Sequence, residues 1–520
     1  MSTAAVDQEQ IAVPMEQRSV PLDVIVDRVA PLATLGDTSG VEVTGVVFRD
    51  VDSMAGSLYC CIPGERFDGH AFASAARRAG AVAFLCEHSL GDDVGGAVQL
   101  VVPPGEARAA MARAACSFYG DPATSLAVVG VTGTNGKTTT TYLLRSILDQ
   151  HGWRSGVVGT LDGARTTPEA PELQLALARF RDSGCAAAAI EVTSHALLQR
   201  RVDGICFDVA VFTNLSQDHL DFHGTMESYF AAKSLLFEPD RSRLAVVDVD
   251  DAYGRRLADR AGIETVTYSL SDAADLEVAA TSSRFLLRGR PVRLGLGGAF
   301  NVANALGAAA AAHALGVGED AIVAGLESAR TVPGRFEILE SIDGVTVVVD
   351  YAHTPAALEQ VLGAARSAVV EGPASSAAPA EGVARAGRVV VVFGAGGERD
   401  RGKRPAMGAV ASRLADIVVL TSDNPRSESA AAIADEIRAG ISDGARCYVE
   451  LDRRAAIAYA LESARGGDVV VVAGKGHEAS QQLAGRSLPF DDRAVVRTEL
   501  ERQGRALPRW ASPPLAGGAS

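Results

Sequence analysis

One stretch of the sequence has the composition of a phosphate-binding turn. Residues 130–141 read GVTGTNGKTTTT and begin within the apolar run LAVVGV, so we expect a buried strand, a glycine turn and then a helix. In such a turn the backbone N–H groups and the helix N-terminus face an anion. Lys137 would reach the β- and γ-phosphates of a nucleotide, and the hydroxyl of Thr138 would hold Mg²⁺. The general template GxxxxGK[ST] is met except at its first glycine, where the chain has Val131.

Two further residues stand where ligands of such a metal are expected. Glu191 ends the apolar run AAAAIE, and His219 follows the run DVAVF within TNLSQDHLDFHG. Because parallel strands end at one edge of a sheet, these side chains can converge there, and Mg²⁺ prefers oxygen ligands. The residues alone leave another interpretation open, since an acid at a strand end can cap the next element and a single histidine can be structural.

A lysine lies within an apolar helical pattern. In SYFAAKSLLF, helical spacing places Tyr229, Lys233 and Leu236 on one stripe, with Phe230 and Phe237 beside it. A charged amine that faces a core is unfavourable, so such a lysine usually extends its amine to water. A neutral, desolvated amine can instead react with CO₂. Both interpretations remain open at this point.

The strand and helix patterns around these residues predict three α/β domains, as expected for a chain of 520 residues. We expect a disordered tail at 1–20, an N-terminal domain at 21–123, a central domain at 124–331 and a C-terminal domain at 332–520. Helical patterns separate the central runs SGVVGT, CAAAAIEV, DVAVFTN and LAVVDV, which predicts a parallel sheet of the P-loop type. The runs VTVVVD, RVVVVFG, DIVVLTS and DVVVVAG predict a second, doubly wound Rossmann-like sheet.

The overall composition excludes several classes of partner. The net charge is −15 and no long basic run offsets it, so neither nucleic acid nor an anionic membrane is expected to bind. No apolar run reaches the about 18 residues of a membrane span, and the N-terminus lacks the pattern of a signal peptide. Seven scattered cysteines without a CxxC pair argue against a disulfide framework or a zinc site. We therefore expect a cytoplasmic monomer that acts on small molecules.

A longer series of motifs resembles the Mur ligase family, the ATP-dependent, amide-forming ligases of peptidoglycan synthesis. The resemblance runs from about residue 40 to residue 500 and keeps the family's order. The motifs are GTNGKTTT, EVTSHAL, TNLSQDHLDFHG, AAKSLLF, FNVANALGA, VPGRFE, VDYAHTP, FGAGGERDRGKRP, DNPR and AGKGHE. The phosphate loop is also similar to that of the related folylpolyglutamate synthases. The resemblance implies ATP and Mg²⁺ as cofactors.

The resemblance also implies roles for individual residues. The expected ATP-binding residues are Gly133, Thr134, Asn135, Gly136, Lys137, Thr138, Thr139, Asn301, Arg335, Asp350 and His353. The expected metal ligands are Thr138, Glu191, His219 and Lys233 as a carbamate, and the expected catalytic residues are Lys137, His219 and Lys233. The expected contacts of a UDP-sugar substrate are Thr166, Thr167, Thr193, Gln199 and Arg201. On the residues alone, Asn301 can also be a helix N-cap and Arg335 a solvated hinge residue.

The motif DNPR at 423–426 is expected to select the amino acid that the ligase adds. It follows the run DIVVLTS, at the sheet edge where ligands of doubly wound folds bind, although Asn-Pro by itself indicates only a turn. In the family this motif marks acceptance of meso-diaminopimelate, whose extra carboxylate Arg426 can bind with two hydrogen bonds. The resemblance implies an acceptor site made of Arg399, Asp423, Asn424, Pro425, Arg426, Gly474 and Glu478.

These assignments predict transfer of the γ-phosphate of ATP to a carboxylate. The γ-carboxylate of D-Glu in UDP-N-acetylmuramoyl-L-Ala-D-Glu would become an acyl phosphate, which the amine of diaminopimelate would attack. A lysine-adding ligase of the same family and a folylpolyglutamate synthase-like ligase are alternatives; the latter should lack DNPR and an N-terminal UDP domain. A nucleotide-dependent scaffold is disfavoured because every predicted catalytic position is filled. A P-loop motor would need a Walker-B acid and oligomerisation arginines, of which we find no clear set.

Overall fold

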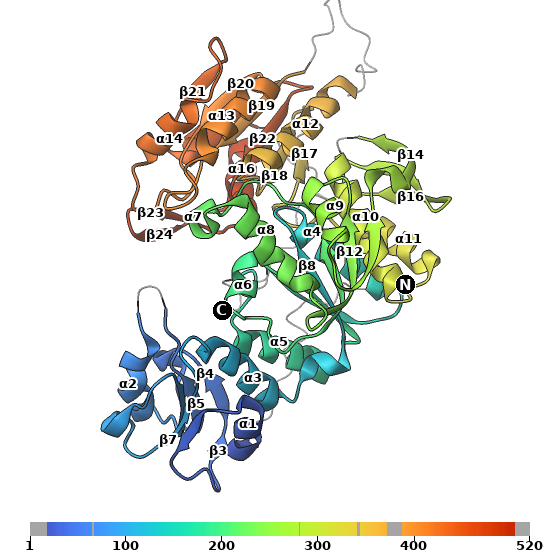
Figure 1. The fold of residues 1–520 in the computed structure, drawn as a ribbon. Helices are drawn as coiled ribbons and strands as arrows, with labels where there is room; N and C mark the ends of the chain where they lie inside the picture. The colour runs from blue at the N-terminus through green and yellow to red at the C-terminus, as the bar shows by residue number, and fades with distance from the viewer. Residues whose placement is uncertain are drawn as a thin grey trace, which may run out of the picture.

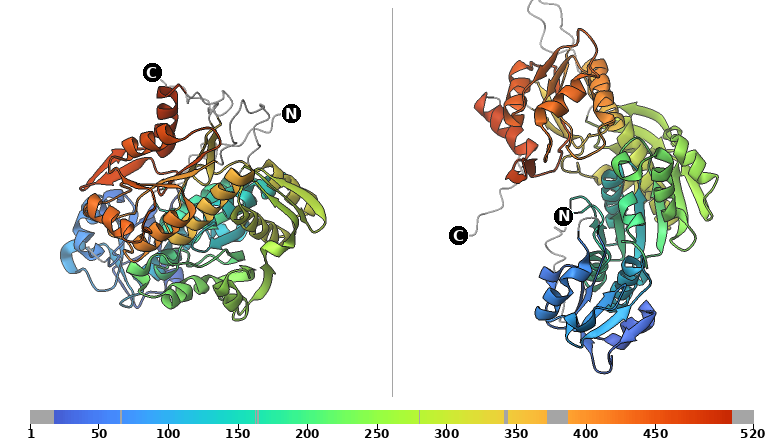
Figure 2. Two further views of the ribbon diagram at one scale, coloured as in Figure 1. Left: turned by 90° about the horizontal axis from the view of Figure 1, so that it is seen from above. Right: turned by 60° about the vertical axis from the view of Figure 1, so that its left-hand side comes forward.

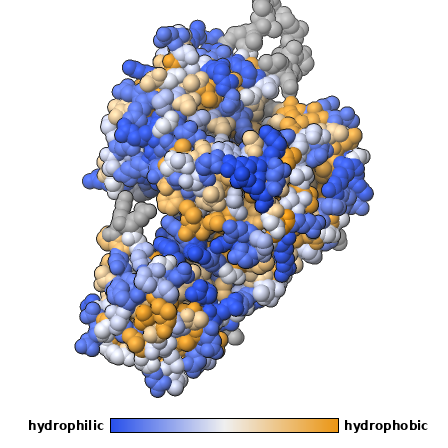
Figure 3. Space-filling model, in the orientation of Figure 1, coloured by the Kyte–Doolittle hydropathy of each residue, from blue (hydrophilic) through white to orange (hydrophobic). Residues whose placement is uncertain are grey.

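The structure, a computed structural model, describes residues 18–64, 67–161, 163, 165–279, 281–340, 344–371 and 387–504. Residues 1–17 of the expected tail lie outside this range. The chain forms three α/β lobes, and the N-terminal and C-terminal lobes lie on either side of the central one (Figures 1 and 2). The face drawn in Figure 3 is mainly hydrophilic over the C-terminal lobe.

The N-terminal lobe is a five-stranded sheet in the order β2-β7-β6-β5-β4, in which only β2 is antiparallel to its neighbour. Its strands are β2 (Ala33–Leu35), β4 (Gly45–Val47), β5 (Ser57–Cys60), β6 (Ala83–Cys86) and β7 (Val98–Val101). Helices α1 (Leu22–Val29) and α3 (Ala107–Tyr119) pack on one face and α2 (Ala73–Arg78) on the other. The short strands β1 (Val20–Pro21) and β3 (Glu42–Val43) pair beside them.

The central lobe is a six-stranded, fully parallel sheet in the order β13-β12-β11-β8-β10-β9. Its strands are β8 (Ala127–Thr132), β9 (Ser155–Val158), β10 (Ala187–Glu191), β11 (Phe207–Phe212), β12 (Ser242–Asp248) and β13 (Glu264–Tyr268). One face is covered by α4 (Lys137–Gln150), α10 (Ala299–Ala314) and α11 (Glu319–Ser328). The other is covered by α5 (Ala170–Asp182), α6 (Ser194–Leu198), α8 (Met226–Ser234) and α9 (Ala252–Ala258). Burial on both faces explains why these strands are continuous apolar runs.

An antiparallel sheet that the sequence analysis did not foresee is attached to this lobe. It consists of β14 (Ala273–Val278), β15 (Ser283–Leu287) and β16 (Arg290–Leu294). Phe285, Leu287, Val292 and Leu294 point into the same core as α10 and α11, whereas the residues between them are more exposed. This alternation around the turn at Gly289 is the signal that a period-2 search would have found.

The C-terminal lobe is a six-stranded sheet in the order β17-β18-β22-β19-β20-β21, with only β17 antiparallel. Its strands are β17 (Glu337–Glu340), β18 (Thr346–Asp350), β19 (Val389–Phe393), β20 (Ile417–Leu420), β21 (Cys447–Val449) and β22 (Val469–Ala473), followed by the hairpin β23 (Ser480–Leu483) and β24 (Arg486–Pro489). Helices α12 (Pro355–Glu371), α13 (Lys403–Leu414) and α14 (Ala430–Arg438) cover one face, and α15 (Arg453–Ser463) and α16 (Asp492–Arg502) the other. The expected doubly wound sheet is thus confirmed. Among the described residues, no helix combines the length and hydropathy that crossing a bilayer requires.

The helix that follows the phosphate loop is held by a close helix–helix contact. A Cβ added at Gly325 of α11 would lie 2.3 Å from Cα of Ile147 in α4. Gly325→Ala should therefore destabilise the protein by about 1–3 kcal/mol through overpacking, measured as a lower melting temperature. Gly363→Ala in α12 is the matched control, because nothing lies within 4 Å of its added Cβ. It should stabilise by about 0.5–1 kcal/mol, and equal effects of both variants would contradict this packing.

Candidate active site

The phosphate loop lies where the strand order of the central sheet reverses. β8 runs between β10 and β11, and the chain passes from it through residues 133–136 into α4. Gly136 has φ +88°, and a Cβ there would lie 2.2 Å from Asn304 Oδ1. A Cβ on Gly133 would lie 1.9 Å from Thr213 Oγ1. Only glycine fits these two positions, so the loop N–H groups can approach an anion closely.

The amine of Lys137 lies inside this loop. It donates to the carbonyl oxygens of Gly133 and Thr134, at 2.9 Å each. Burial lowers the pKa of Lys137, and the charge of Glu191 opposes this shift. A phosphate in the loop would give the amine a charged partner, which makes stronger hydrogen bonds than a carbonyl does.

A hydroxyl and a carboxylate meet beside the loop. Glu191, fully buried at the end of β10, accepts from Thr138 Oγ1 at 2.9 Å and from the Thr160 N–H at 2.8 Å. Arg335 of the C-terminal lobe donates to the same Thr138 hydroxyl at 3.1 Å. The pair of oxygens fits a hard cation such as Mg²⁺. Among the described residues, no three His, Cys, Asp or Glu side chains form a metal-binding group. Phosphate and water oxygens would therefore have to complete the coordination.

Lys233 does not extend to solvent. Its side chain on α8 is 1 % exposed, and its amine donates to Gly133 O at 2.8 Å and lies 4.8 Å from the centre of the Tyr229 ring. Burial, reinforced by the nearby charge of Lys137, lowers the pKa of Lys233 well below its usual value. The shift is toward the neutral amine, the form that reaction with CO₂ requires.

Asp218, a residue the sequence analysis did not select, joins the central lobe to the C-terminal lobe. Its carboxylate lies 3.0 Å from Lys403 Nζ, 3.3 Å from His353 Nε2 and 3.5 Å from His219 Nε2. Although burial raises the pKa of Asp218, the hydrogen bond and charge of His353 and the charge of Lys403 hold it well below its usual value. Burial lowers the pKa of His219 to about 3, so this imidazole is neutral near pH 7 and free to act as a ligand.

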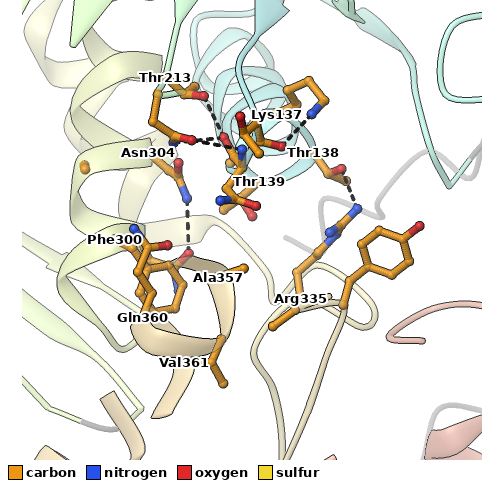
Figure 4. A pocket seen from close by; sticks show the side chains of 18 of the residues that line it. Lys137, Thr138, Thr139, Thr213, Phe300, Asn304, Arg335, Ala357, Gln360 and Val361 are labelled. Carbon is orange, nitrogen blue, oxygen red and sulfur yellow. Dashed lines mark hydrogen bonds between the residues drawn. The ribbon is translucent and has the colours of Figure 1, made fainter. Parts of the chain in front are cut away.

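The remaining nucleotide residues surround a cavity of about 1140 Å³ between the central and C-terminal lobes. Figure 4 shows Arg335 pointing at Thr138 on one side of this cavity, and Asn304 near Phe300 on the other. The wall formed by Phe300, Ala357 and Val361 is apolar and lies near the amides of Asn301 and Asn304, which suits a planar base.

Asn301 and Asp350 have well-defined partners in this cavity. Asn301 Nδ2 donates to Gly297 O at 2.7 Å; since α10 is capped by Gly298, the N-cap interpretation of Asn301 is wrong. Asp350 accepts from the N–H groups of Phe336 and Ala352, at 2.6 and 2.7 Å. Burial raises the pKa of Asp350 and the charge of Arg335 lowers it.

The residues expected to contact the UDP-sugar begin at the backbone carbonyl of Glu191. Thr167 Oγ1 donates to Glu191 O at 2.7 Å and lies 3.2 Å from Thr193 Oγ1. Arg201 donates to Thr167 O at 2.9 Å and pairs with a carboxylate, Glu169, at 3.0 Å. The cavity is lined by Thr166, Thr167, Thr193 and Arg201. Gln199 does not line it; its side-chain oxygen accepts from Arg201 at 2.5 Å.

The DNPR motif forms a second cluster, at the carboxyl edge of the C-terminal sheet. Asn424 donates to Glu478 Oε2 at 2.8 Å, and the fully buried Lys475 donates to the same oxygen at 2.8 Å. Asp423 Oδ2 is buried and has no hydrogen-bond partner among the residues that the structure describes. A Cβ on Gly474 would lie 2.4 Å from this oxygen, so glycine leaves room beside it. An unpaired buried carboxylate oxygen fits an incoming ammonium group.

Two arginines face each other across the same edge. Arg426, with φ +54° after the fixed turn of Pro425, donates to Gly397 O at 2.6 Å. Burial lowers the pKa of Arg426, and the positive charge of Arg399 lowers it further. Arg399 also lines the nucleotide cavity, so the two sites adjoin. A dicarboxylic amino acid would relieve this repulsion.

The sequence analysis did not select Lys403 and Lys475, although the scarcity of lysine in the chain marks them. Only four of the 49 basic Lys and Arg residues are lysines: Lys137, Lys233, Lys403 and Lys475. Lys403 and Lys475 are 4 % and 0 % exposed and contact Asp218 and Glu478. A chain that otherwise uses arginine has its four lysines in these two clusters, and an amine is a more compact charge than a guanidinium.

Comparison with known proteins places this geometry in a family. Three sequence models match: the Mur ligase middle domain at residues 131–312, the Mur ligase glutamate ligase domain at 334–476 and the Mur ligase family catalytic domain at 44–119. A protein of Streptomyces avermitilis named UDP-N-acetylmuramoyl-L-alanyl-D-glutamate–2,6-diaminopimelate ligase is 41 % identical over 505 residues, covering 91 % of this chain and 96 % of its own. A protein of the same name from Gloeobacter violaceus is 43 % identical over 484 residues, covering 89 % and 95 %.

Solved structures give the same result. A structure with that ligase name has a TM-score of 0.59 and 33 % identity, over 89 % of this chain and 96 % of its own. MurF ligase from Thermotoga maritima in complex with ADP shares the fold, with a TM-score of 0.60 and 22 % identity over 88 % and 98 % of the two chains.

ATP with Mg²⁺ should raise the melting temperature of the protein, and Lys137→Ala should abolish most of that rise. A ligand at 100 times its Kd stabilises the folded state by about 2.7 kcal/mol, which thermal-shift measurements resolve. Arg243→Ala is the control, because this side chain is 70 % exposed and pairs only at the surface with Asp208. A full rise in Lys137→Ala would contradict the placement of the phosphates.

Proposed function

Because this chain belongs to the Mur ligase family, we propose that it adds meso-diaminopimelate to UDP-N-acetylmuramoyl-L-Ala-D-Glu at the expense of ATP, in peptidoglycan synthesis. The observation that carries the proposal is the proximity of two sites, one built on the phosphate loop and one on the DNPR turn. The phosphate loop with Glu191 and Lys233 ends the central sheet, and the DNPR cluster ends the C-terminal sheet beside it. Arg399 belongs to both.

The chain's residues mainly position the reactants and neutralise charge. The loop N–H groups and Lys137 would hold the phosphates of ATP. Arg335 would bind the phosphate nearest Thr138, and the apolar wall at Phe300 would contact the base. Mg²⁺ held at Thr138, Glu191 and His219 would supply further neutralisation. Lys403 and His353 of the C-terminal lobe contact the Asp218 carboxylate next to His219 and so connect that lobe to the central one.

The reaction balances as two substitutions. An oxygen of the D-Glu γ-carboxylate attacks the γ-phosphorus of ATP, and the bond to ADP breaks. The acceptor amine then attacks the carbonyl carbon of the acyl phosphate, phosphate leaves and the nitrogen loses a proton. Thr166, Thr167, Thr193 and Arg201 line the cavity beside Glu191, where they would hold the UDP-linked substrate near the γ-phosphate.

Lys233 is proposed to react with CO₂, which would place a carbamate anion beside the loop. Burial lowers the pKa of Lys233 and so disfavours the charged amine, and an anion there would balance the charge of Lys137. Lys233 is also the more buried of the two amines that contact Gly133 O.

The acceptor cluster favours diaminopimelate over L-lysine. Asp423 and Glu478 would bind the distal ammonium group, Arg426 the extra carboxylate and Arg399 the other carboxylate. Lysine lacks the second carboxylate, so it would leave the half-buried Arg426 without a carboxylate partner. The likeness to a folylpolyglutamate synthase of Mycobacterium tuberculosis, at 20 % identity, reflects fold alone. We further propose that the protein acts in the cytoplasm as a monomer, in keeping with seven cysteines that are all free.

Purified protein with ATP, Mg²⁺ and UDP-N-acetylmuramoyl-L-Ala-D-Glu should release phosphate when meso-diaminopimelate is added, and not when L-lysine is added. Arg426→Met should lower kcat/KM for diaminopimelate by about 10–100-fold, the loss expected for a charged hydrogen bond. Arg438→Ala, an exposed arginine of the same lobe, should have no effect. Turnover with L-lysine but not with diaminopimelate would still support a ligase of this family but would refute the proposed role of Arg426.

Lys233→Ala should reduce turnover by at least about 100-fold while the thermal shift with ATP persists, because the amine is proposed to act on catalysis rather than on nucleotide binding. Intact-protein mass spectrometry at high bicarbonate, after trapping of the carbamate, should find the added CO₂ in wild type only. Wild-type rates in Lys233→Ala would refute this assignment.

A further inference from the structure

An ion pair without solvent access lies behind the acceptor cluster. Arg453 begins α15 and Asp492 begins α16, and they are 1 % and 0 % exposed. Arg453 Nε and Nη2 donate to the two carboxylate oxygens of Asp492, at 2.8 and 2.7 Å. This geometry is bidentate, which fixes the plane of the guanidinium.

The same guanidinium also reaches the ends of two strands. Nη2 donates to Ala473 O at 2.9 Å, and Ala473 is the last residue of β22, directly before Gly474. Nη1 donates at 3.4 Å to Ser422 O, directly before Asp423. One side chain therefore ties together the points at which the GKGHE and DNPR loops leave the sheet.

Neighbouring contacts hold the same loops from the other side. Gln481 Nε2 donates to Asp423 O at 2.9 Å and to Ser422 Oγ at 3.2 Å. The Gln482 N–H donates to Asn424 Oδ1 at 2.9 Å. The loops are thus fixed both by the hairpin above them and by Arg453 beneath them.

We propose that the Arg453–Asp492 pair is the positioning element of the amino-acid acceptor site. It sets the separation of Asp423 and Asn424 from Gly474 and Glu478, and thereby the affinity for the diamino acid; this inference rests on the proposed function. A buried ion pair is replaceable by apolar residues without loss of stability in many proteins, so stability alone does not require one here. The hydrogen bonds from Arg453 to the carbonyl oxygens of Ala473 and Ser422 position the two loops, and apolar side chains cannot make such bonds.

The chain contains a matched control at the opposite end of the same strand. Arg388 donates from Nε and Nη2 to Asp468 Oδ2, at 3.1 and 2.7 Å, and from Nη2 to Ser463 O at 2.6 Å. Arg388 precedes β19 and Asp468 precedes β22, so this pair lies at the amino edge of the sheet. Its loss should affect folding without moving the acceptor loops.

The test compares Arg453→Lys, the double variant Arg453→Met/Asp492→Leu and the control Arg388→Lys. The double variant removes both charges of the ion pair together and should therefore keep the melting temperature of wild type within a few degrees. KM for meso-diaminopimelate should rise about tenfold or more in both Arg453 variants, the effect of losing about one buried hydrogen bond. KM for ATP should change less than about twofold, and hydrogen exchange should accelerate at residues 421–426 and 474–478.

The outcomes separate this inference from the function on which it rests. A wild-type protein that shows no turnover with diaminopimelate refutes the proposed function, and the positioning role with it. An active wild type with an unchanged acceptor KM in the folded double variant refutes the positioning role alone. Equal increases in KM for all substrates, or the same acceptor effect in Arg388→Lys, would show general loosening of the lobe and also overturn it.

Discussion

Two lysine amines donate to one carbonyl oxygen at the base of the phosphate loop. Lys137 and Lys233 lie 2.9 and 2.8 Å from Gly133 O, in surroundings that disfavour charge. Two positive charges so close together repel each other, and among the described residues only the nearby carboxylates Glu191 and Asp218 offset this repulsion, so an added anion would be stabilised there. The two amines lie at the edge where the central sheet meets the C-terminal lobe, and the glycine turn leaves space there for an anion.

The other charges of the site continue the same pattern. Asp218 collects Lys403, His353 and His219 at the junction of two lobes, and Glu191 ends a buried strand beside Thr138. The partners of Glu191 come from the central lobe, whereas His353 and Lys403 reach Asp218 from the C-terminal lobe, so Asp218 joins the two lobes beside the phosphate loop. The acceptor cluster differs because one oxygen of Asp423 still lacks a partner within the described part of the chain.

Local pattern predicted most of the fold. The strands β8, β10, β19 and β22 are continuous apolar runs because both faces of each sheet are covered, and this signal needs no long-range information. The antiparallel sheet β14–β16 was missed because its strands alternate polar and apolar residues and carry no motif. Lys475 was passed over although it stands inside a quoted motif, since its role depends on reaching Asn424, 51 positions away.

The sequence by itself predicted which residues would carry the chemistry: the glycine turn with Lys137, the strand-end Glu191, the lysine in an apolar helical stripe and the DNPR turn. These features are local, because strand ends and turns are formed by consecutive residues. Only the tertiary structure decided their partners. Lys233 meets Gly133 across 100 positions, and Asp218 meets Lys403 across 185. Such contacts depend on how separate sheets pack and close, and burial then decides which of these groups carry charge.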